Sequence, residues 1–243
     1  MIPLRDANPT RRFPIVTIAL IVACFAAWAY ELGLLATGPD ALDAFITHWG
    51  VVPSDVSSAL GGGDVAAMAV ATLFTSQFLH GGWLHILGNM LYLWIFGNNV
   101  EDWLGRFRFV LFYLAGGAVA ALTQVAITPT SDIPTIGASG AIAAVLGAYL
   151  VLFPRARITT LVFLGFFYQL INVPALVVLA FWFVLQLIDG LASLGVTEVT
   201  GGVAVFAHIG GFLFGVVIAL GVRAIRAGRA RPADRPWPPT AVG

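Results

Sequence analysis

Four polar side chains lie within or beside otherwise apolar stretches of this chain, and together they could perform acyl transfer. They are Ser139, His208, His85 and Asn89. A serine becomes a nucleophile at neutral pH when an adjacent base takes its proton, and histidine is the usual base. The N–H groups of a second histidine and an asparagine could stabilise the developing oxyanion. The sequence therefore predicts a Ser139–His208 dyad, with His85 and Asn89 as oxyanion donors.

Each of these residues also has a purely structural interpretation. Ser139 follows Gly137 and Ala138 and precedes another glycine, so it could serve only the close packing of helices. His85 could be an interfacial histidine. Asp189 and Gln186 are expected near the outer end of an apolar run, as interfacial groups rather than proton-relay groups.

The composition is that of a membrane protein. Of 243 residues, 59% are hydrophobic and 10% are charged, and the mean hydropathy is +0.93, whereas a soluble domain carries about 25% charged residues. The net charge is zero, which gives no indication of a nucleic-acid partner. Cys24 is the single cysteine and cannot form an internal disulfide or a metal site alone. We expect no metal and no cofactor.

Six apolar runs approach the roughly 17–25 residues that a membrane-spanning helix needs. They lie at 14–35, 84–98, 107–127, 138–153, 174–193 and 203–222. The second and fourth runs are short, and Gly97 is expected to end the second helix at its C′ position. The predicted fold class is an all-α polytopic membrane protein with a bundle of six transmembrane helices.

The basic residues predict the orientation of this bundle. All twelve are arginines, and they fall before the first run, between the second and third, between the fourth and fifth, and after the sixth. They are Arg5, Arg11, Arg12, Arg106, Arg108, Arg155, Arg157, Arg223, Arg226, Arg229, Arg231 and Arg235. The other three connections contain no arginine. By the positive-inside rule, both termini are cytoplasmic.

This topology brings the four polar side chains to a similar depth below the outer surface. His85 and Asn89 share one face of the second helix through their i, i+4 spacing. Ser139 lies in the first turn of the fourth helix, and His208 lies roughly 8 Å into the sixth at 1.5 Å per residue. Ser139 is therefore also expected beside unpaired backbone N–H groups at a helix N-terminus.

Small residues could let these helices approach closely. Gly140 and neighbouring alanines form a small-residue surface on the fourth helix, and Gly211 and Gly215 form a GxxxG spacing on the sixth. Such faces allow backbones to come near enough for short side chains to touch. Packing of this kind could bring His208 to Ser139.

The predicted domain organisation has three parts. Residues 1–13 form a cytoplasmic N-terminal arm, residues 14–222 form the six-helix domain, and residues 223–243 form an Arg- and Pro-rich cytoplasmic tail, expected to be disordered. Within the domain, residues 36–80 are expected to lie in the outer interface. Residues 156–173 could extend a helix or lie along the membrane surface.

Three motifs in order resemble the rhomboid family of intramembrane serine proteases. They are "HGGWLHILGNM" with His85 and Asn89, "GASG" with Ser139, and "AHIGGFLFG" with His208 and the packing glycines. The resemblance covers about residues 70–220. It implies a six-helix bacterial-type rhomboid with Ser139 as nucleophile and His208 as base. It also implies an oxyanion hole made by the Ser139 backbone N–H, His85 and Asn89, with Gly137 beside it.

Two features depart from the family pattern. Many rhomboids carry a Trp-Arg pair in the first outer loop, whereas Trp49 here is followed by Gly50. Some members have a tyrosine four residues after the serine that stacks on the catalytic histidine, and this position is Ala143 here. The first departure bears on loop stability and the second on the orientation of His208.

The resemblance implies a serine endopeptidase that cleaves single-pass transmembrane substrates near their extracytoplasmic end. The protein is expected to be integral to the lipid bilayer of a bacterial inner (plasma) membrane. The loop at 192–202 is expected to cap the site, and outward tilting of the fifth helix, with Phe181, Trp182 and Phe183, would admit substrate. Two alternatives are a catalytically silent rhomboid-like scaffold that binds transmembrane helices, and a small membrane transporter.

Overall fold

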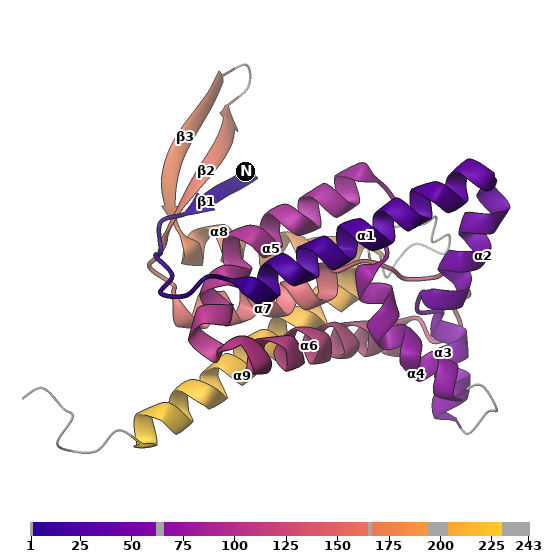
Figure 1. Ribbon diagram of the computed structural model, residues 1–243. Coiled ribbons are helices and arrows are strands. Elements are labelled where there is room, and N and C mark those ends of the chain that lie inside the picture. The colour runs from indigo at the N-terminus through magenta and orange to yellow at the C-terminus, as the bar shows by residue number, and fades with distance from the viewer. Residues whose placement is uncertain (1, 62–65, 165–166, 194–203, 230–243) are drawn as a thin grey trace, which may run out of the picture.

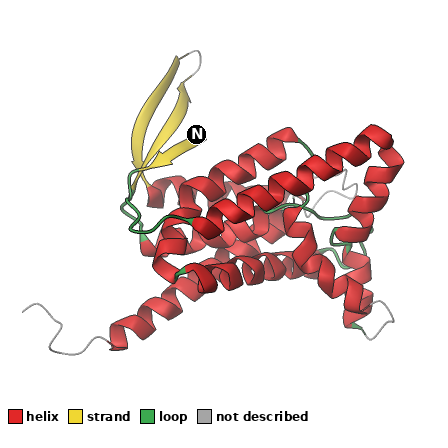
Figure 2. Cartoon of the chain, viewed as in Figure 1, coloured by secondary structure: helices red, strands yellow, loops and turns green. Residues whose placement is uncertain are grey.

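The computed structural model describes residues 2–61, 66–164, 167–193 and 204–229, and it consists mainly of helices with a small sheet at one end (Figure 1, Figure 2). The helices are α1 (Ile15–Thr37), α2 (Pro39–Trp49), α3 (Pro53–Leu60), α4 (Ala66–Thr75), the 3₁₀ turn η1 (Ser76–Phe78), α5 (Trp83–Leu104), α6 (Arg106–Ile127), α7 (Ser139–Leu152), α8 (Ala175–Ser193) and α9 (Val205–Arg229). The strands are β1 (Ile2–Asp6), β2 (Arg157–Leu164) and β3 (Phe167–Pro174).

Four helices among the described residues are long and apolar enough to cross a membrane, namely α1, α6, α8 and α9. The chain is therefore a membrane protein. Two other helices lie where the sequence predicts spans. α5 has 22 residues but includes the polar stretch "NNVED", and α7 is apolar but has only 14 residues.

The short helix α7 lies at the centre of the bundle. Its residues from Gly140 to Tyr149 are all buried, and it contacts α5, α6, α8 and α9. Fourteen residues at 1.5 Å each make about 21 Å, less than the roughly 30 Å hydrocarbon thickness of a bilayer. By length alone, α7 is therefore too short to cross the hydrocarbon core of a bilayer.

Glycines allow α9 to lie directly against α7. A Cβ atom built on Gly211 would collide with the Gly140 carbonyl oxygen, and one on Gly215 would collide with the Ala144 carbonyl oxygen. A Cβ at Gly140 would lie 2.6 Å from Cβ of Ala120, so α6 also packs closely here. The backbones of α7 and α9 are thus in contact where larger side chains would hold them apart.

The sheet overturns the all-α prediction, although the mostly helical fold is as expected. β2 and β3 form an antiparallel hairpin between α7 and α8 that occupies nearly all of the range 156–173 and ends at Pro174, and β1 pairs antiparallel with β2 (Figure 2). The stretch "ITTLV" at 158–162 is rich in β-branched residues, which favour a pleated strand over a helix. Hydropathy alone could not distinguish a strand from a helix in this range.

The N-terminal arm is structured because β1 is fixed to the helices as well as to β2. A carboxylate oxygen of Asp6 accepts hydrogen bonds from the Tyr149 hydroxyl at 2.9 Å and from the Asn99 amide nitrogen at 2.6 Å. Tyr149 belongs to α7 and Asn99 to α5. Residues 1–13, expected as a polar arm, therefore include an anchored strand.

The second helix does not end at Gly97, as the sequence suggested, but at Leu104, before Gly105 with its φ of 84°. Gly97 instead allows close contact with α1, because a Cβ there would lie 3.2 Å from the Thr17 side chain. The polar stretch inside α5 has a structural use. Glu101 accepts hydrogen bonds from the backbone N–H groups of Val16 and Thr17, at 3.0 and 2.7 Å, and so caps α1.

The sixth helix is longer than expected. α9 continues to Arg229, so the predicted boundary between residues 222 and 223 falls inside a helix. Arg226 stabilises this extension: its guanidinium lies 3.9 Å from the centre of the Trp103 ring and donates a 2.9 Å hydrogen bond to the Trp103 carbonyl. Residues 230–243, the rest of the predicted tail, lie outside the described residues.

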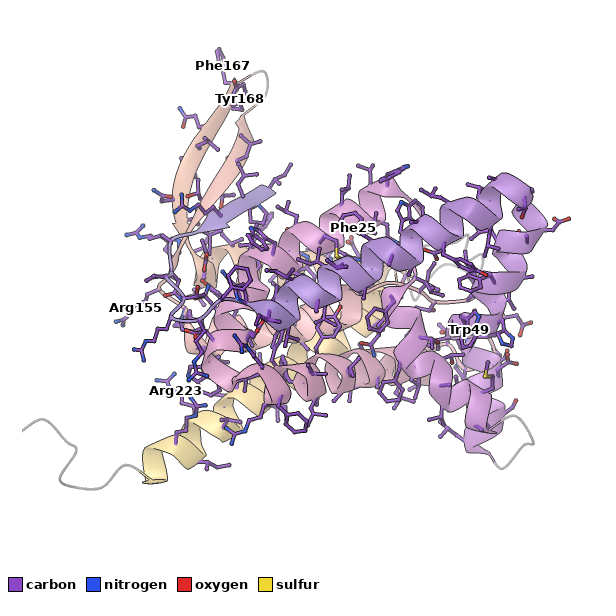
Figure 3. All side chains as sticks on the ribbon, viewed as in Figure 1. Phe25, Trp49, Arg155, Phe167, Tyr168 and Arg223 are labelled. Atoms are coloured by element: carbon purple, nitrogen blue, oxygen red, sulfur yellow. The ribbon has the colours of Figure 1, made fainter. Side chains whose placement is uncertain are left out.

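The two ends of the bundle differ in charge. Arg155 and Arg223 lie at the same end as the sheet, whereas Trp49 lies at the opposite end (Figure 3). The arginines at the start of α6 follow directly on the end of α5 and belong to the first end as well. This separation of basic residues along the helix axes is the pattern from which the positive-inside rule assigns a cytoplasmic side.

The contact between α7 and α9 predicts a selective effect of added methyl groups. Gly215→Ala should destabilise the protein, by about 1–3 kcal/mol, because the new Cβ collides with the Ala144 carbonyl. Gly221→Ala on the same helix is the matched control, since nothing lies within 4 Å of that position. Thermal unfolding of both variants in detergent measures the difference. Equal stability would contradict the role of Gly215 in packing.

Candidate active site

The start of α7 places the Ser139 hydroxyl at the edge of a cavity. Ser139 is the first residue of the helix and is half-buried, after the fully buried Ala138 at the N-cap. The first N–H groups of a helix have no partner within it and carry the positive end of its dipole. Ser139 therefore lies beside the free N–H groups of the first turn of α7.

A tight turn before Ser139 is fixed by backbone contacts with distant elements. Gly137 adopts a φ of 126°, which favours glycine, and its N–H donates a 2.9 Å hydrogen bond to the Ser76 carbonyl of η1. Two residues earlier, Thr135 pairs with Val51 through hydrogen bonds of 2.7 and 3.0 Å. The segment that follows α2 is thus joined to the serine turn, although Trp49 is followed by Gly50 and not by arginine.

His85 lies beside this turn. A Cβ atom built on Gly137 would lie 2.6 Å from His85 Nε2 and 3.6 Å from Ser139 Oγ, so the ring nitrogen and the hydroxyl face the same small space. The backbone N–H of Gly81 donates to His85 Nδ1 at 3.3 Å. Because Nδ1 accepts, the proton of the neutral ring resides on Nε2. His85 therefore presents an N–H donor toward the serine.

Asn89, one turn further along α5, is 9% exposed. Its side-chain nitrogen Nδ2 is buried and has no hydrogen-bond partner within the part of the chain that the structure describes. A buried donor without a partner is costly. Asn89 lines the same cavity as His85, so this free N–H is available to an oxyanion in the cavity.

His208 reaches the cavity from α9 and is 8% exposed. Its Nδ1 lies 2.6 Å from Oε1 of Gln186 on α8, and its ring centre lies 5.9 Å from that of Trp182, with an angle of 39° between the planes. Between the described atoms of Ser139 and His208 the structure records no direct hydrogen bond, although both residues line the cavity.

The cavity has a volume of about 750 Å³ and unites the residues that the sequence singled out. Ser139, His208, His85, Asn89 and Gly137 all line it, together with residues of η1, α6 and α8. None of the described residues that line it is acidic. The arrangement thus resembles a serine–histidine pair with oxyanion donors, and among the described residues no carboxylate contacts the histidine.

The sequence analysis did not assign two residues that support the site. Gln186, interpreted as an interfacial group, contacts His208 instead. Glu31 on α1 is fully buried and accepts hydrogen bonds from the His80 backbone N–H at 3.2 and 3.3 Å. It thereby holds the turn whose Gly81 N–H contacts His85. Glu31 could have been singled out from the sequence, because it is the one charged residue in the apolar run 14–35.

The three aromatic residues expected at the gate have different surroundings. Phe181 is 47% exposed on the outside of α8. Phe183 stacks on Phe212 of α9, with ring centres 4.4 Å apart, and Trp182 lies against His208. Of the loop expected to cap the site, 192–202, all but the first two residues lie outside the described residues.

Comparison with known proteins identifies the family. The family model of the Rhomboid domain matches residues 67–225, more than half of the chain. The chain therefore belongs to the rhomboid family, as the three motifs indicated. The matched range begins in α4 and includes Ser139, His208, His85, Asn89 and Gly137.

Several curated proteins are similar to this chain. It is 32% identical over 146 residues, 58% of its length, to presenilin-associated rhomboid-like protein A, mitochondrial, of Danio rerio. It is 32% identical over 176 residues, 66% of its length, to RHOMBOID-like protein 12, mitochondrial, of Arabidopsis thaliana. It is 42% identical over 78 residues, 32% of its length, to rhomboid protease GluP of Bacillus subtilis. The matches cover 34%, 48% and 15% of these relatives' own lengths.

The positions of His85 and Asn89 predict the effect of removing each donor. Asn89→Ala should leave Ser139 and His208 in place but slow peptide cleavage by roughly 10–10³-fold, the scale of one lost oxyanion donor. His85→Ala should act similarly. Cleavage rates of a fluorogenic or single-pass substrate in detergent give the measurement. Unchanged rates in both variants would remove these side chains from the site.

Proposed function

We propose that this protein is an intramembrane serine endopeptidase that uses a Ser139–His208 dyad. The observation that carries the proposal is the cavity where Ser139, His208, His85 and Asn89 meet, although they come from three helices distant in the sequence. Membership of the rhomboid family and the similarity to a protein named as a rhomboid protease support the same activity.

In the proposed reaction, Ser139 Oγ attacks the substrate carbonyl carbon while His208 Nε2 takes the hydroxyl proton. The resulting oxyanion accepts hydrogen bonds from the Ser139 backbone N–H, His85 Nε2–H and Asn89 Nδ2–H. The amine leaves with the proton from His208, and an acyl-enzyme remains on Ser139. Water, activated by His208, then releases the second product and restores the serine.

The proposed topology has six membrane spans, with α5 and α7 added to α1, α6, α8 and α9. Both termini are then cytoplasmic, at the arginine-rich end, and Ser139 lies below the extracytoplasmic surface. The bacterial plasma membrane is our prediction for the location. The similar proteins bear mitochondrial names as well as the name of a Bacillus subtilis protease, so the location is a proposal separate from the activity.

The substrates proposed are single-pass transmembrane proteins, bound within the bilayer and cut near their extracytoplasmic end. A regular helix hides its carbonyl carbons among its own hydrogen bonds, so the substrate must unwind before Ser139 can attack. Glycine or proline in its outer turns favours unwinding, because both weaken helices. Outward tilting of α8 is the proposed route of entry from the lipid.

A silent scaffold that binds transmembrane helices is the second candidate. The specific observation in its favour is that the described Ser139 hydroxyl and His208 ring make no direct hydrogen bond. A fluorophosphonate probe separates the two functions, because it labels only a serine that a base activates. Labelling that disappears in Ser139→Ala supports the protease.

The dyad predicts that its two members act as a unit. Ser139→Ala should abolish cleavage of a single-pass substrate while the protein still inserts and folds, and His208→Ala should be about as damaging. The double variant should be little worse, since effects of cooperating groups do not add. Gel-based cleavage in proteoliposomes measures all three. Full cleavage by Ser139→Ala would exclude the serine mechanism.

The depth of Ser139 predicts where substrates are cut. Because α7 begins below the extracytoplasmic surface, products should end within the outer turns of the substrate helix, with small residues at the cut. Mass spectrometry of both products locates the bond. Cuts clustered at the cytoplasmic end of the substrate helix would overturn both the topology and the site.

A further inference from the structure

Two side chains of α8 hold the ring of His208. The Oε1 atom of Gln186 lies 2.6 Å from His208 Nδ1, and the Trp182 ring lies 5.9 Å from the imidazole centre. Trp182 and Gln186 are four residues apart on one helix, so both project from the same face. The ring is thus fixed by one directional hydrogen bond and by one aromatic surface.

The hydrogen bond determines which nitrogen of His208 carries the proton. A neutral imidazole has one N–H and one nitrogen with a free lone pair, and a carboxamide oxygen can only accept. The contact with Gln186 Oε1 therefore places the proton on Nδ1. Nε2 is left with its lone pair, which is the form that a base needs to take the proton of a serine hydroxyl.

Among the described residues around the ring, no other side chain accepts a hydrogen bond from Nδ1. Ala143, one turn after Ser139 on α7, is fully buried and offers only a methyl group. The described lining of the cavity contains no carboxylate that could accept from Nδ1. The second ring near the serine, His85, is the opposite tautomer, because its Nδ1 accepts from Gly81. The two histidines are thus set by different partners for different roles.

We propose that Gln186 is a positioning residue that sets the tautomer and orientation of His208, with Trp182 restricting rotation of the ring. This inference rests on the proposed protease function. It also links the entry of substrate to the orientation of the catalytic base. Because both groups belong to α8, tilting this helix to admit substrate withdraws them from His208. The base is then correctly oriented only when α8 has returned to the bundle.

Gln186→Leu tests the hydrogen bond, because leucine has a similar size and cannot accept. We expect kcat to fall roughly 10–100-fold, by analogy with the loss of a group that orients a metal-bound histidine, with KM nearly unchanged. Gln186→Glu keeps an acceptor at the same position and should restore most of the activity. Leu187→Val on the lipid-facing side of α8 is the matched control and should cleave at the wild-type rate.

Trp182 is less suited to a single test. Replacing it by a smaller residue would remove its contact with the His208 ring and also weaken the packing of α8 against Phe212 of α9. The Gln186 variants isolate the effect on the histidine. Wild-type kcat in Gln186→Leu, with Ser139→Ala inactive, would overturn the positioning role and leave the protease function intact. Cleavage by Ser139→Ala would instead overturn the protease function.

Nitrogen-15 NMR of histidine-labelled protein reports the tautomer without any cleavage assay. The His208 signals, identified by their loss in His208→Gln, should show a protonated Nδ1 and an unprotonated Nε2 in the wild type. In Gln186→Leu, the Nε2–H tautomer should gain population. A wild-type ring protonated on Nε2 would overturn the inference, and this result does not depend on the folding of Gln186→Leu. An unchanged tautomer in folded Gln186→Leu would overturn it as well.

Discussion

The close contact between α7 and α9 is the constraint on which the site depends. Glycines at positions 211 and 215 let the α9 backbone rest on the carbonyl groups of Gly140 and Ala144, since any Cβ there would collide. This contact brings His208 to the cavity that Ser139 also lines. A helix pair held apart by leucines would keep the same residues but separate their side chains by more than a short serine can reach.

Burial of polar groups in an apolar bundle explains most of the remaining architecture. Such groups are costly unless they are hydrogen-bonded, and several of the described ones have a specific partner. Glu31 accepts from the His80 backbone, Glu101 caps α1, and Gln186 accepts from His208. Asn89 Nδ2, Gln77 Oε1 and Gln124 Oε1 have no hydrogen-bond partner among the described residues, and all three residues line the cavity. An unpaired donor is tolerable where a ligand supplies the acceptor.

The segment after α2 and the sheet hold the two ends of this bundle. At one end, Thr135 pairs with Val51 and Gly137 with Ser76, so this segment and η1 support the serine turn without an arginine. At the other end, Asp6 joins β1 to α5 and α7. The hairpin escaped prediction because hydropathy alone does not distinguish a short apolar strand from a helix or a surface segment.

The amino-acid sequence by itself determined that the chain lies in a membrane, how its arginines are distributed, and which serine, histidines and asparagine are the candidates, because hydropathy, charge and motif spacing are properties of residues along the chain. It also indicated the family. Tertiary structure alone decided that Gln186 faces His208, that Gly97 packs against α1 rather than ending a helix, and that Glu31 supports the turn before His85. Each of these depends on how one helix is rotated against another, which packing of the whole bundle sets and no local pattern encodes.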